Sequence, residues 1–401
     1  MFKSALPGFR DFYPQELAER AFIMSTWREV ARRYAFVEYD GPPLEPLDLY
    51  TQKSGDEIVG QLYNFVDKGG REVALRPEMT PTVARMVGAR ANALRKPVRW
   101  FSMPQLFRYE RQQKGRLREH YQLNVDIFGS ADVAADAELV ACAVDMMRAF
   151  GLTAQDVVVR VSDRRILQAF LESLGVPAGS IVGVYGVIDK LERTPADIST
   201  EKLAALGVSP QAIERILTIA DVEFSEIESR LRDSSAAAQV ADFGAFLRYV
   251  PALLGGDASW LRVDLSIVRG LAYYTGIVFE LFDRSGEFRA ICGGGRYDTL
   301  LASLGGADMP ALGFGMGDVV LGELLRKKGL LRTAESGADF WISGDDDVSL
   351  ERIMSEAARL RAEGSAVEYA LRSQSLNKQK KAAQASGAKS FVTLSNDGTN
   401  G

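Results

Sequence analysis

The sequence has few of the residues that carry most metal and redox chemistry. Among its 401 residues there is a single histidine, His120, and there are two cysteines, Cys142 and Cys292. The two cysteines lie far apart and form no pair with metal-ligand spacing, so we expect a reduced, cytoplasmic setting without a metal site. No apolar run approaches the length of a membrane span, and the N-terminal residues contain no apolar signal core. We therefore expect no membrane partner.

The net charge limits the kinds of partner that we expect, and the length indicates how many domains the chain forms. The formal net charge of −5 argues against indiscriminate nucleic-acid binding, although a local basic patch on an acidic protein can still bind phosphates. A chain of 401 residues exceeds the size at which one core usually stops growing, so we expect two or more domains. Apolar residues make up 47% of the sequence, which is ample for globular cores.

The most informative stretch is 106–129, LFRYERQQKGRLREHYQLNVDIFG, which predicts two antiparallel strands joined by a charged loop. Apolar and polar residues alternate in both strands, and a period of two places each set on one face. The apolar face carries Phe107, Tyr109, Leu123, Val125 and Ile127. The polar face carries Arg108, Glu110, Gln122, Asn124 and Asp126. The loop between the strands is basic, with Arg111, Lys114, Arg116 and Arg118.

Two interpretations of this hairpin are open. Its arginines could hold a polyphosphate while its carboxylates and amide hold a small zwitterion. The commoner meaning of such alternation is a sheet with one solvated polar face, and the hairpin alone favours that meaning. His120 lies where the loop meets the second strand, and we interpret it as a surface or loop histidine.

Further motifs reverse that preference. Residues 264–298 contain DLSIVRGLAYYTGIVFELFD and then ICGGGRYD, and together with the hairpin they resemble histidyl-tRNA synthetase, a class II aminoacyl-tRNA synthetase. The hairpin resembles motif 2 of that family, VRGLAYYTG resembles its histidine-specific motif RGLDYY, and GGGRYD resembles a glycine-rich segment that lines the histidine pocket. LRPEMTP at 75–81 and YAFVEYDGPPLE at 34–45 are similar to the RPExT segment and to motif 1.

The resemblance implies ATP-dependent activation of L-histidine to histidyl-adenylate and transfer of the histidyl group to tRNA(His). In activation the substrate carboxylate attacks the α-phosphate of ATP. That nucleophile is already ionised at neutral pH, so the reaction requires positioning and charge stabilisation rather than a general base. The sequence, with one histidine and no nucleophile–base motif, suits this chemistry. The resemblance also implies that Mg²⁺ accompanies ATP and that the chain works as a homodimer.

The same resemblance assigns roles to individual residues. Arg108 and Arg269 are expected to be catalytic and to reach the α-phosphate from opposite sides, because a planar guanidinium suits two oxygens. The expected ATP-binding residues are Arg108, Glu110, Arg116 and Gln122. The expected histidine-binding residues are Glu78, Thr80, Gln122, Asp126, Arg269, Tyr273, Tyr274, Gly293, Gly294, Gly295 and Tyr297. Among them, Asp126 and Tyr274 match the partners of the two imidazole nitrogens.

Three residues depart from the family pattern. Asp126 stands where glutamate is usual, Ala272 replaces the aspartate of RGLDYY, and Val320 aligns with the motif 3 arginine that touches the ATP γ-phosphate. The third departure leaves an alternative open, the catalytically inactive, histidine-sensing regulatory subunit of ATP phosphoribosyltransferase. The intact FRYER, VRGLxYYTG and RPExT segments favour the synthetase. A generic RNA-binding module would explain the basic loop but not the histidine-pocket residues.

The resemblance and the periodicities together predict an α+β fold. A class II synthetase core with an antiparallel sheet and flanking helices is expected over 1–330, with a helical insertion at about 167–259 that leans over the tRNA acceptor stem. Strand–helix alternation predicts a partial α/β anticodon-binding-like domain over 336–401. Within the core we expect helices at 15–34, 81–87 and 136–150. We expect strands at 36–39, 157–161, 261–265, 277–282 and 311–314.

Overall fold

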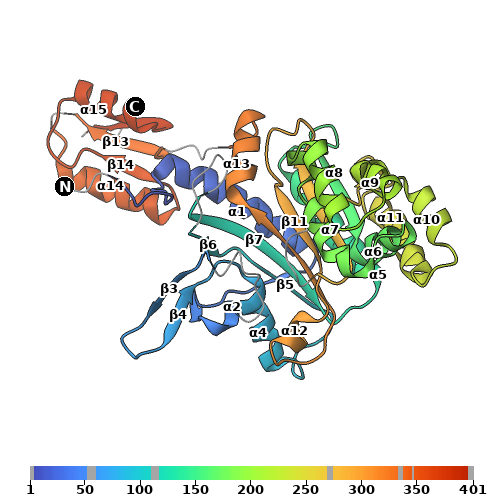
Figure 1. Cartoon of the computed structure of the whole chain (residues 1–401). Helices are drawn as coiled ribbons and strands as arrows, with labels where there is room; N and C mark the ends of the chain where they lie inside the picture. Colours follow the sequence, from blue (N-terminus) through green and yellow to red (C-terminus); the bar gives the residue numbers. More distant parts are fainter. Residues whose placement is uncertain are drawn as a thin grey trace. The chain divides into compact units, whose positions relative to one another are not determined.

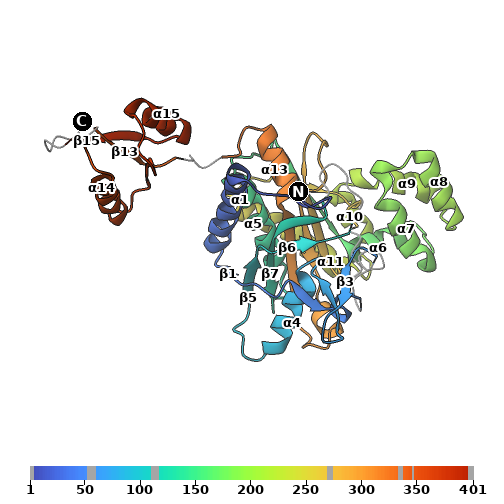
Figure 2. The same cartoon turned by 90° about the vertical axis from the view of Figure 1, so that its left-hand side faces the viewer.

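The computed structural model describes residues 4–51, 60–109, 117–268, 274–332, 337–345 and 347–395. Contacts divide the chain into two compact units. The first comprises Met1–Asp11 and Ile23–Leu331, and the second comprises Phe12–Phe22 and Arg332–Gly401. Figures 1 and 2 show the elements of each unit from two directions. Among the helices that the described ranges contain, none is long and apolar enough to cross a bilayer.

The first unit is built on one large sheet that is mostly antiparallel. Within the described residues it has nine strands, and the main path runs β1-β5-β7-β12-β11-β10-β8-β9, with β6 paired to β7. The β1–β5 and β8–β9 pairs are parallel, and the other pairs are antiparallel. In sheet order the strands are β1 (Val37–Glu38), β5 (Val98–Ser102), β7 (Glu119–Phe128), β12 (Ala311–Gly317), β11 (Cys292–Arg296), β10 (Ile277–Asp283), β8 (Val157–Asp163), β9 (Leu261–Val263) and β6 (Gln105–Phe107). The predicted α+β class is confirmed, and the five predicted strands in this unit form with ends that differ by a few residues.

Helices cover this sheet. Helix α5 (Val133–Ala149) forms where a helix was predicted, and so does helix α1 (Pro14–Arg33), whose residues from Ile23 onward belong to this unit. Helix α5 is apolar on nearly every side, because it packs on β7, β11 and β12 and is covered in turn by helix α11 (Ala237–Leu253). It begins at Asp132, whose carboxylate accepts a hydrogen bond from the backbone N–H of Ala134 at 2.8 Å. Helix α13 (Asp318–Lys327) follows β12 directly.

A group of helices lies on one side of the sheet in both views (Figures 1 and 2). They fall in the region predicted to be a helical insertion, and each buries one apolar stripe against its neighbours. Their bounds are α6 (Arg164–Ser173), α7 (Ile181–Ile188), α8 (Ala196–Ala205), α9 (Pro210–Leu217), α10 (Phe224–Leu231) and α11 (Ala237–Leu253). The helical character of this region agrees with the prediction, while its role at the acceptor stem and its limits as a domain stay predictions.

A smaller antiparallel sheet and three helices complete the first unit. The sheet has the order β2-β4-β3 among the described residues. These elements are β2 (Leu44–Pro46), β3 (Tyr63–Val66), β4 (Glu72–Leu75), α2 (Asp48–Thr51), α4 (Thr80–Arg90) and α12 (Leu300–Ser303). Strand β4 leads directly into the segment before α4, and that segment with the first residue of α4 carries Glu78 and Thr80 to the face of the large sheet.

The second unit contains a parallel sheet of order β14-β13-β15 in its described part. Its elements are β13 (Phe340–Gly344), α14 (Leu350–Ala362), β14 (Val367–Tyr369), α15 (Leu376–Ser386) and β15 (Ser390–Leu394). One helix covers each face: Ile342 packs with residues of α14, and Trp341 packs with Ala383 of α15. The alternation of strands and helices predicted from the sequence is confirmed.

Candidate active site

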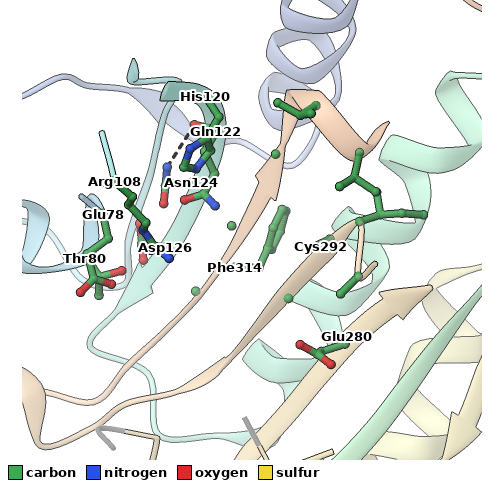
Figure 3. Close-up of a pocket in the computed structure, with 18 of the residues that line it drawn as sticks. Glu78, Thr80, Arg108, His120, Gln122, Asn124, Asp126, Glu280, Cys292 and Phe314 are labelled. Carbon is green, nitrogen blue, oxygen red and sulfur yellow. Dashed lines mark hydrogen bonds between the residues drawn. The ribbon is translucent and has the colours of Figure 1, made fainter. Parts of the chain in front are cut away.

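A cavity of about 370 Å³ opens on one face of the large sheet, over β7, β12, β11 and β10 (Figure 3). Its walls come from the pocket-facing side of β7, the end of β6, the segment that begins α4, the strands β10 to β12 with the residues that flank them, and the start of α13. Lining residues include Glu78, Thr80, Arg108, His120, Gln122, Asn124, Asp126, Tyr274, Glu280, Cys292, Gly293, Tyr297, Gly313, Phe314, Gly315, Val319 and Val320.

Strand β7 supplies the polar wall. Residues 120, 122, 124 and 126 alternate along the strand and all line the cavity. Asn124 and Asp126 are only 5% and 4% exposed, and the Asn124 amide donates to the backbone oxygen of Gln122 at 3.0 Å (dashed in Figure 3). The commoner meaning of the alternation, a solvated polar face, is therefore wrong for this strand. Its polar side chains are aimed into a cavity.

Arg108 reaches the cavity from the end of β6. Its backbone N–H donates to the oxygen of Arg118 at 2.9 Å, which extends the β6–β7 pairing by one step. Its guanidinium Nε donates to the backbone oxygen of Pro77 at 3.0 Å. That contact ties Arg108 to the segment that presents Glu78 and Thr80, so three predicted site residues from two separate motifs share one wall.

His120 was predicted to be a surface or loop histidine, and that prediction is wrong. Residue 120 belongs to β7, where it pairs with Leu106, and its side chain is half-buried and lines the cavity (Figure 3). Burial lowers the pKa of His120 to about 3, and the charges of Arg108 and Arg10 act in the same direction. The imidazole is thus neutral near pH 7. The alternation offered a signal, because residue 120 continues the series of 122, 124 and 126.

Asp126 lies at the most enclosed part of the polar wall. The hydroxyl of Tyr297 donates to its Oδ1, while its Oδ2 has no hydrogen-bond partner among the described residues. Burial raises the pKa of Asp126 to about 7, and the hydrogen bond from Tyr297 offsets part of that rise. Gly313 on β12 faces this carboxylate, and a Cβ atom there would lie 2.2 Å from Asp126 Oδ1. A side chain at 313 would displace the carboxylate.

The three glycines of β11, on the wall opposite β7, do not all have the same role. Gly293 lines the cavity, whereas Gly294 and Gly295 are not among its lining residues. A Cβ at Gly294 would lie 2.2 Å from the backbone oxygen of Gly313, and one at Gly295 would lie 2.6 Å from that of Ile277. At these two positions glycine therefore allows the strands to approach each other, rather than allowing a ligand to approach the backbone.

A buried ion pair, which was not predicted from the sequence, holds the end of β11. Arg296 and Asp136 of α5 are 5% and 4% exposed, and the Arg296 Nε lies 3.2 Å from each carboxylate oxygen. Burial raises the pKa of Asp136 to about 6, and Arg296 counteracts that rise. Asp298 also contacts Arg296 and accepts from the Ala311 N–H at 3.1 Å. Tyr297, held between these two anchored residues, is thereby fixed in place beside Asp126.

The start of α13 forms the apolar end of the cavity. Val319 and Val320 both line it, so a branched apolar side chain occupies the position where the family pattern has an arginine. Asp318 is pinned there, since its carboxylate accepts from the Tyr121 N–H at 2.9 Å and from Arg10 at 2.9 Å. Arg10 also donates to Glu119 at 2.6 Å. Strand β7, helix α13 and the N-terminal segment are thus joined at one point.

Several predicted residues lie outside the described residues. They are Glu110, Arg116, Arg269, Ala272 and Tyr273. Of the predicted residues that the structure describes, it brings Glu78, Thr80, Arg108, Gln122, Asp126, Tyr274, Gly293 and Tyr297 into one cavity. These eight come from segments between 78 and 297, and the order of strands in the sheet is what unites them.

The family model of histidyl-tRNA synthetase matches residues 8–317. The chain belongs to the histidyl-tRNA synthetase family. The histidine–tRNA ligase of Opitutus terrae is 45% identical over 392 residues, covering 96% of this chain and 89% of that protein. The chloroplastic/mitochondrial histidine–tRNA ligase of Arabidopsis thaliana is 42% identical over 370 residues, covering 92% of this chain and 75% of that protein. The crystal structure of histidyl-tRNA synthetase from Nostoc sp. PCC 7120 is similar with a TM-score of 0.85 at 25% identity, covering 99% of this chain and 92% of that one.

The match to the histidyl-tRNA synthetase family confirms the resemblance inferred from the motifs. The matched region, 8–317, contains every described residue of the cavity wall up to the end of β12. The structural likeness extends over nearly the whole chain. The cavity therefore lies inside the part of the chain that is shared with histidyl-tRNA synthetases.

Proposed function

We propose that this chain activates L-histidine with ATP to histidyl-adenylate and transfers the histidyl group to tRNA(His). The observation that carries the proposal is one cavity that combines a buried carboxylate, a phenol beside it and an arginine at the entrance wall. Membership in the family supports it, since relatives 39–45% identical to this chain are named histidine–tRNA ligase. Those names also favour the ligase over the regulatory-subunit alternative.

The polar wall holds histidine by its two ends. Glu78, Thr80 and Gln122 supply acceptors for the α-ammonium group, and Asp126 accepts from an imidazole N–H. Tyr274, which is 9% exposed and lines the cavity, binds the other ring nitrogen. A site built to hydrogen-bond both nitrogens rejects amino acids that leave its groups unpaired, by factors on the order of 10⁴. Tyr297, Tyr273 and Gly293 complete the proposed histidine pocket, while Gly294 and Gly295 let the strands behind it pack closely.

Activation needs charge stabilisation more than proton transfer. The histidine carboxylate attacks the α-phosphorus, a new P–O bond forms, and pyrophosphate leaves with the electrons of the broken bond. Arg108 faces the α-phosphate with a planar pair of donors, and Arg269 is proposed to act from the other side. Glu110, Arg116 and Gln122 are proposed to bind ATP. His120 stays neutral beside Arg108 and offers a flat, uncharged surface to the nucleotide.

Mg²⁺ is proposed to enter with the phosphates of ATP. This ion commonly keeps several waters and takes one or two carboxylates together with substrate phosphates. Glu280 on β10 lines the cavity and is a carboxylate that fits this role. Val320 contributes no charge, so the charge of the γ-phosphate must be met by Mg²⁺ and by other cations of the site.

The working form is proposed to be a cytoplasmic homodimer. Strand β1 pairs only with β5 among the described strands, and Val37 on it is 61% exposed. Leu44 and Phe65 on the smaller sheet are 37% and 51% exposed. Exposed apolar side chains on an edge strand suit a self-complementary contact with a second copy. Light scattering tests this, and a monomer with full activity at micromolar concentration would contradict it.

Histidine-dependent exchange of pyrophosphate into ATP tests the proposed reaction, with charging of tRNA(His) as the second step. We expect exchange with L-histidine and none with other amino acids. A protein that binds histidine but supports no exchange would instead match the regulatory-subunit alternative.

A further inference from the structure

Three buried polar atoms behind the histidine pocket have no hydrogen-bond partner among the described residues. They are the hydroxyl of Tyr39, the Oγ of Ser102 and the Oδ2 of Asp126. Ser102 is fully buried and Asp126 is 4% exposed. Leaving a buried polar group unpaired is costly, so each of these atoms calls for a bridging molecule or a ligand group.

The sheet register places these three atoms on one face. Strand β5 pairs with β7 so that Trp100 lies opposite Asp126 and Ser102 lies opposite Asn124. Strand β1 pairs with β5 in parallel, and the Tyr39 N–H continues that ladder by donating to the oxygen of Phe101 at 2.9 Å. Side chains two residues apart share a face, so Tyr39 and Ser102 lie on the face that carries Asp126.

Packing brings Tyr39 toward the same carboxylate. Its ring contacts that of Trp100 at a centroid distance of 5.4 Å and packs against the apolar cluster that includes Tyr274 and Tyr297. Burial, followed by the negative charges of Asp126 and Asp40, raises the pKa of Tyr39 well above its usual value. The hydroxyl thus keeps its proton and can act as a donor near Asp126.

We propose that Tyr39 and Ser102 are positioning residues for Asp126, acting through one buried water that joins both hydroxyls to the free carboxylate oxygen. Neighbouring strands lie about 4.8 Å apart, and β5 with Ser102 lies between β1 and β7. The long Tyr39 side chain and the short Ser102 hydroxyl on the middle strand can therefore meet Asp126 through a water better than by direct contact. Three polar partners are enough to hold such a water. The arrangement stabilises the ionised carboxylate and turns its remaining lone pairs toward the imidazole.

The proposal rests on the function proposed above and adds two residues to its histidine pocket. It also accounts for aspartate at 126, where the family usually has glutamate. A carboxylate one methylene shorter stays closer to the sheet, where the hydroxyls of Tyr39 and Ser102 lie. Tyr39 follows β1, the strand at the proposed dimer contact, so the same segment would serve the interface and the pocket.

The test is the pH dependence of the KM for histidine in pyrophosphate exchange, for Tyr39→Phe and Ser102→Ala. Removing a donor to the ionised carboxylate raises its pKa further, so the acid limb of histidine binding should move to higher pH. Near pH 7 we expect the KM for histidine to rise about tenfold, as for loss of a hydrogen bond to a charged group, with kcat within about twofold. Near pH 9 the difference should shrink.

Other titratable groups must be separated from Asp126. The groups that share its cavity are Glu78 ahead of α4, Arg108 after β6, His120 on β7, Glu280 on β10, Cys292 on β11, and Tyr274 and Tyr297. The imidazole of the substrate titrates too, but it is the same for every variant. The displacement between the curves of variant and wild type therefore reports on Asp126.

Matched controls remove equivalent groups elsewhere. Ser162 on β8 is also fully buried with an unpartnered Oγ in the described structure, and Tyr34 donates to Asp145 at 2.7 Å. Ser162→Ala and Tyr34→Phe should leave the histidine pH profile in place. The proposal is overturned if both test variants keep the wild-type profile. It is also overturned if kcat falls and KM rises at all pH values together with a loss of thermal stability. Absence of exchange in the wild-type protein would instead refute the proposed function.

Discussion

The two walls of the cavity work in opposite ways. The β7 wall presents a polar side chain at every second position, whereas β11 and β12 face it with glycines. The β7 wall supplies hydrogen-bonding groups, and the glycines of β11 and β12 leave space for those groups and for a ligand. A substitution on the β7 wall should therefore remove an interaction, while a substitution on the glycine wall should displace one.

The largest effect is expected from the polar wall at Arg108. Arg108→Ala should lower the rate of pyrophosphate exchange by about 10²-fold or more, because a preorganised donor to the transition state is lost. The KM for histidine should change much less. Arg359→Ala is the matched control, since Arg359 lies on the exposed face of α14 and pairs with Glu356 and Glu363. Near-normal exchange by the Arg108 variant would contradict the assignment.

The next largest effect is expected at Asp126, where two ligands distinguish a role in histidine binding from a role in folding. Asp126→Asn should weaken histidine binding by about 10- to 100-fold, while binding of ATP alone stays nearly intact. Calorimetric titration with each ligand would show this. Equal losses for both ligands would point to a folding defect.

The same residue should also set a pH dependence of stability. The pKa of Asp126 is raised to about 7, so between about pH 4 and 7 the native state holds a proton that the unfolded state releases. The free energy of unfolding should therefore fall as pH rises through this window, and Asp126→Asn should lack that slope. Denaturant melts at both ends of the window measure it. Parallel curves for variant and wild type would be inconsistent with a raised pKa.

Two alanine substitutions distinguish the glycines that make room for a side chain from those that let two strands pack together. The three atoms nearest to a Cβ at Gly315 would all belong to the side chain of Gln122, at 2.8 to 2.9 Å, whereas the atom nearest to a Cβ at Gly294 would be a backbone oxygen at 2.2 Å. Gly315→Ala should raise the KM for histidine about tenfold with little change in melting temperature, because Gln122 can move. Gly294→Ala should destabilise the protein by about 3 kcal/mol, because the paired strands cannot move apart to make room for the methyl group. Gly186→Ala, in open space on α7, controls for the added methyl group.

The smallest effect is expected at His120. Its pKa of about 3 keeps it neutral, so it should contribute nothing to the pH profile of exchange between about pH 5 and 9. His120→Phe keeps a flat ring and should keep the profile, even if the KM for ATP changes. Loss of an acid limb in this variant would show that His120 titrates in the working range.

These contrasts explain what could be read from the sequence. The polar wall was predictable because its residues are identified by local sequence patterns. These patterns are the alternation in β7 and the motifs around Glu78, Arg108 and Tyr297. The second strand was predicted from Gln122, whereas β7 begins at Glu119, so His120 was missed. The roles of Gly294 and Gly295 were not predictable, since they depend on which backbone lies across the sheet. The pair of Arg296 with Asp136 was hidden for the same reason: it joins residues 160 positions apart.

The pairing of β7 with β12 also bears on how the protein is made. Residues 122–128 bond to residues 311–317, and Arg10 closes the same point by contacting Glu119 and Asp318. The centre of the sheet therefore cannot close until about four-fifths of the chain has left the ribosome. At the usual rate of about 5–20 residues per second, strand β7 waits on the order of 10 seconds or more with the edge that pairs with β12 unpaired. Slow codons or a chaperone acting between β8 and β12 should change the yield of active enzyme more than the same intervention placed after α13.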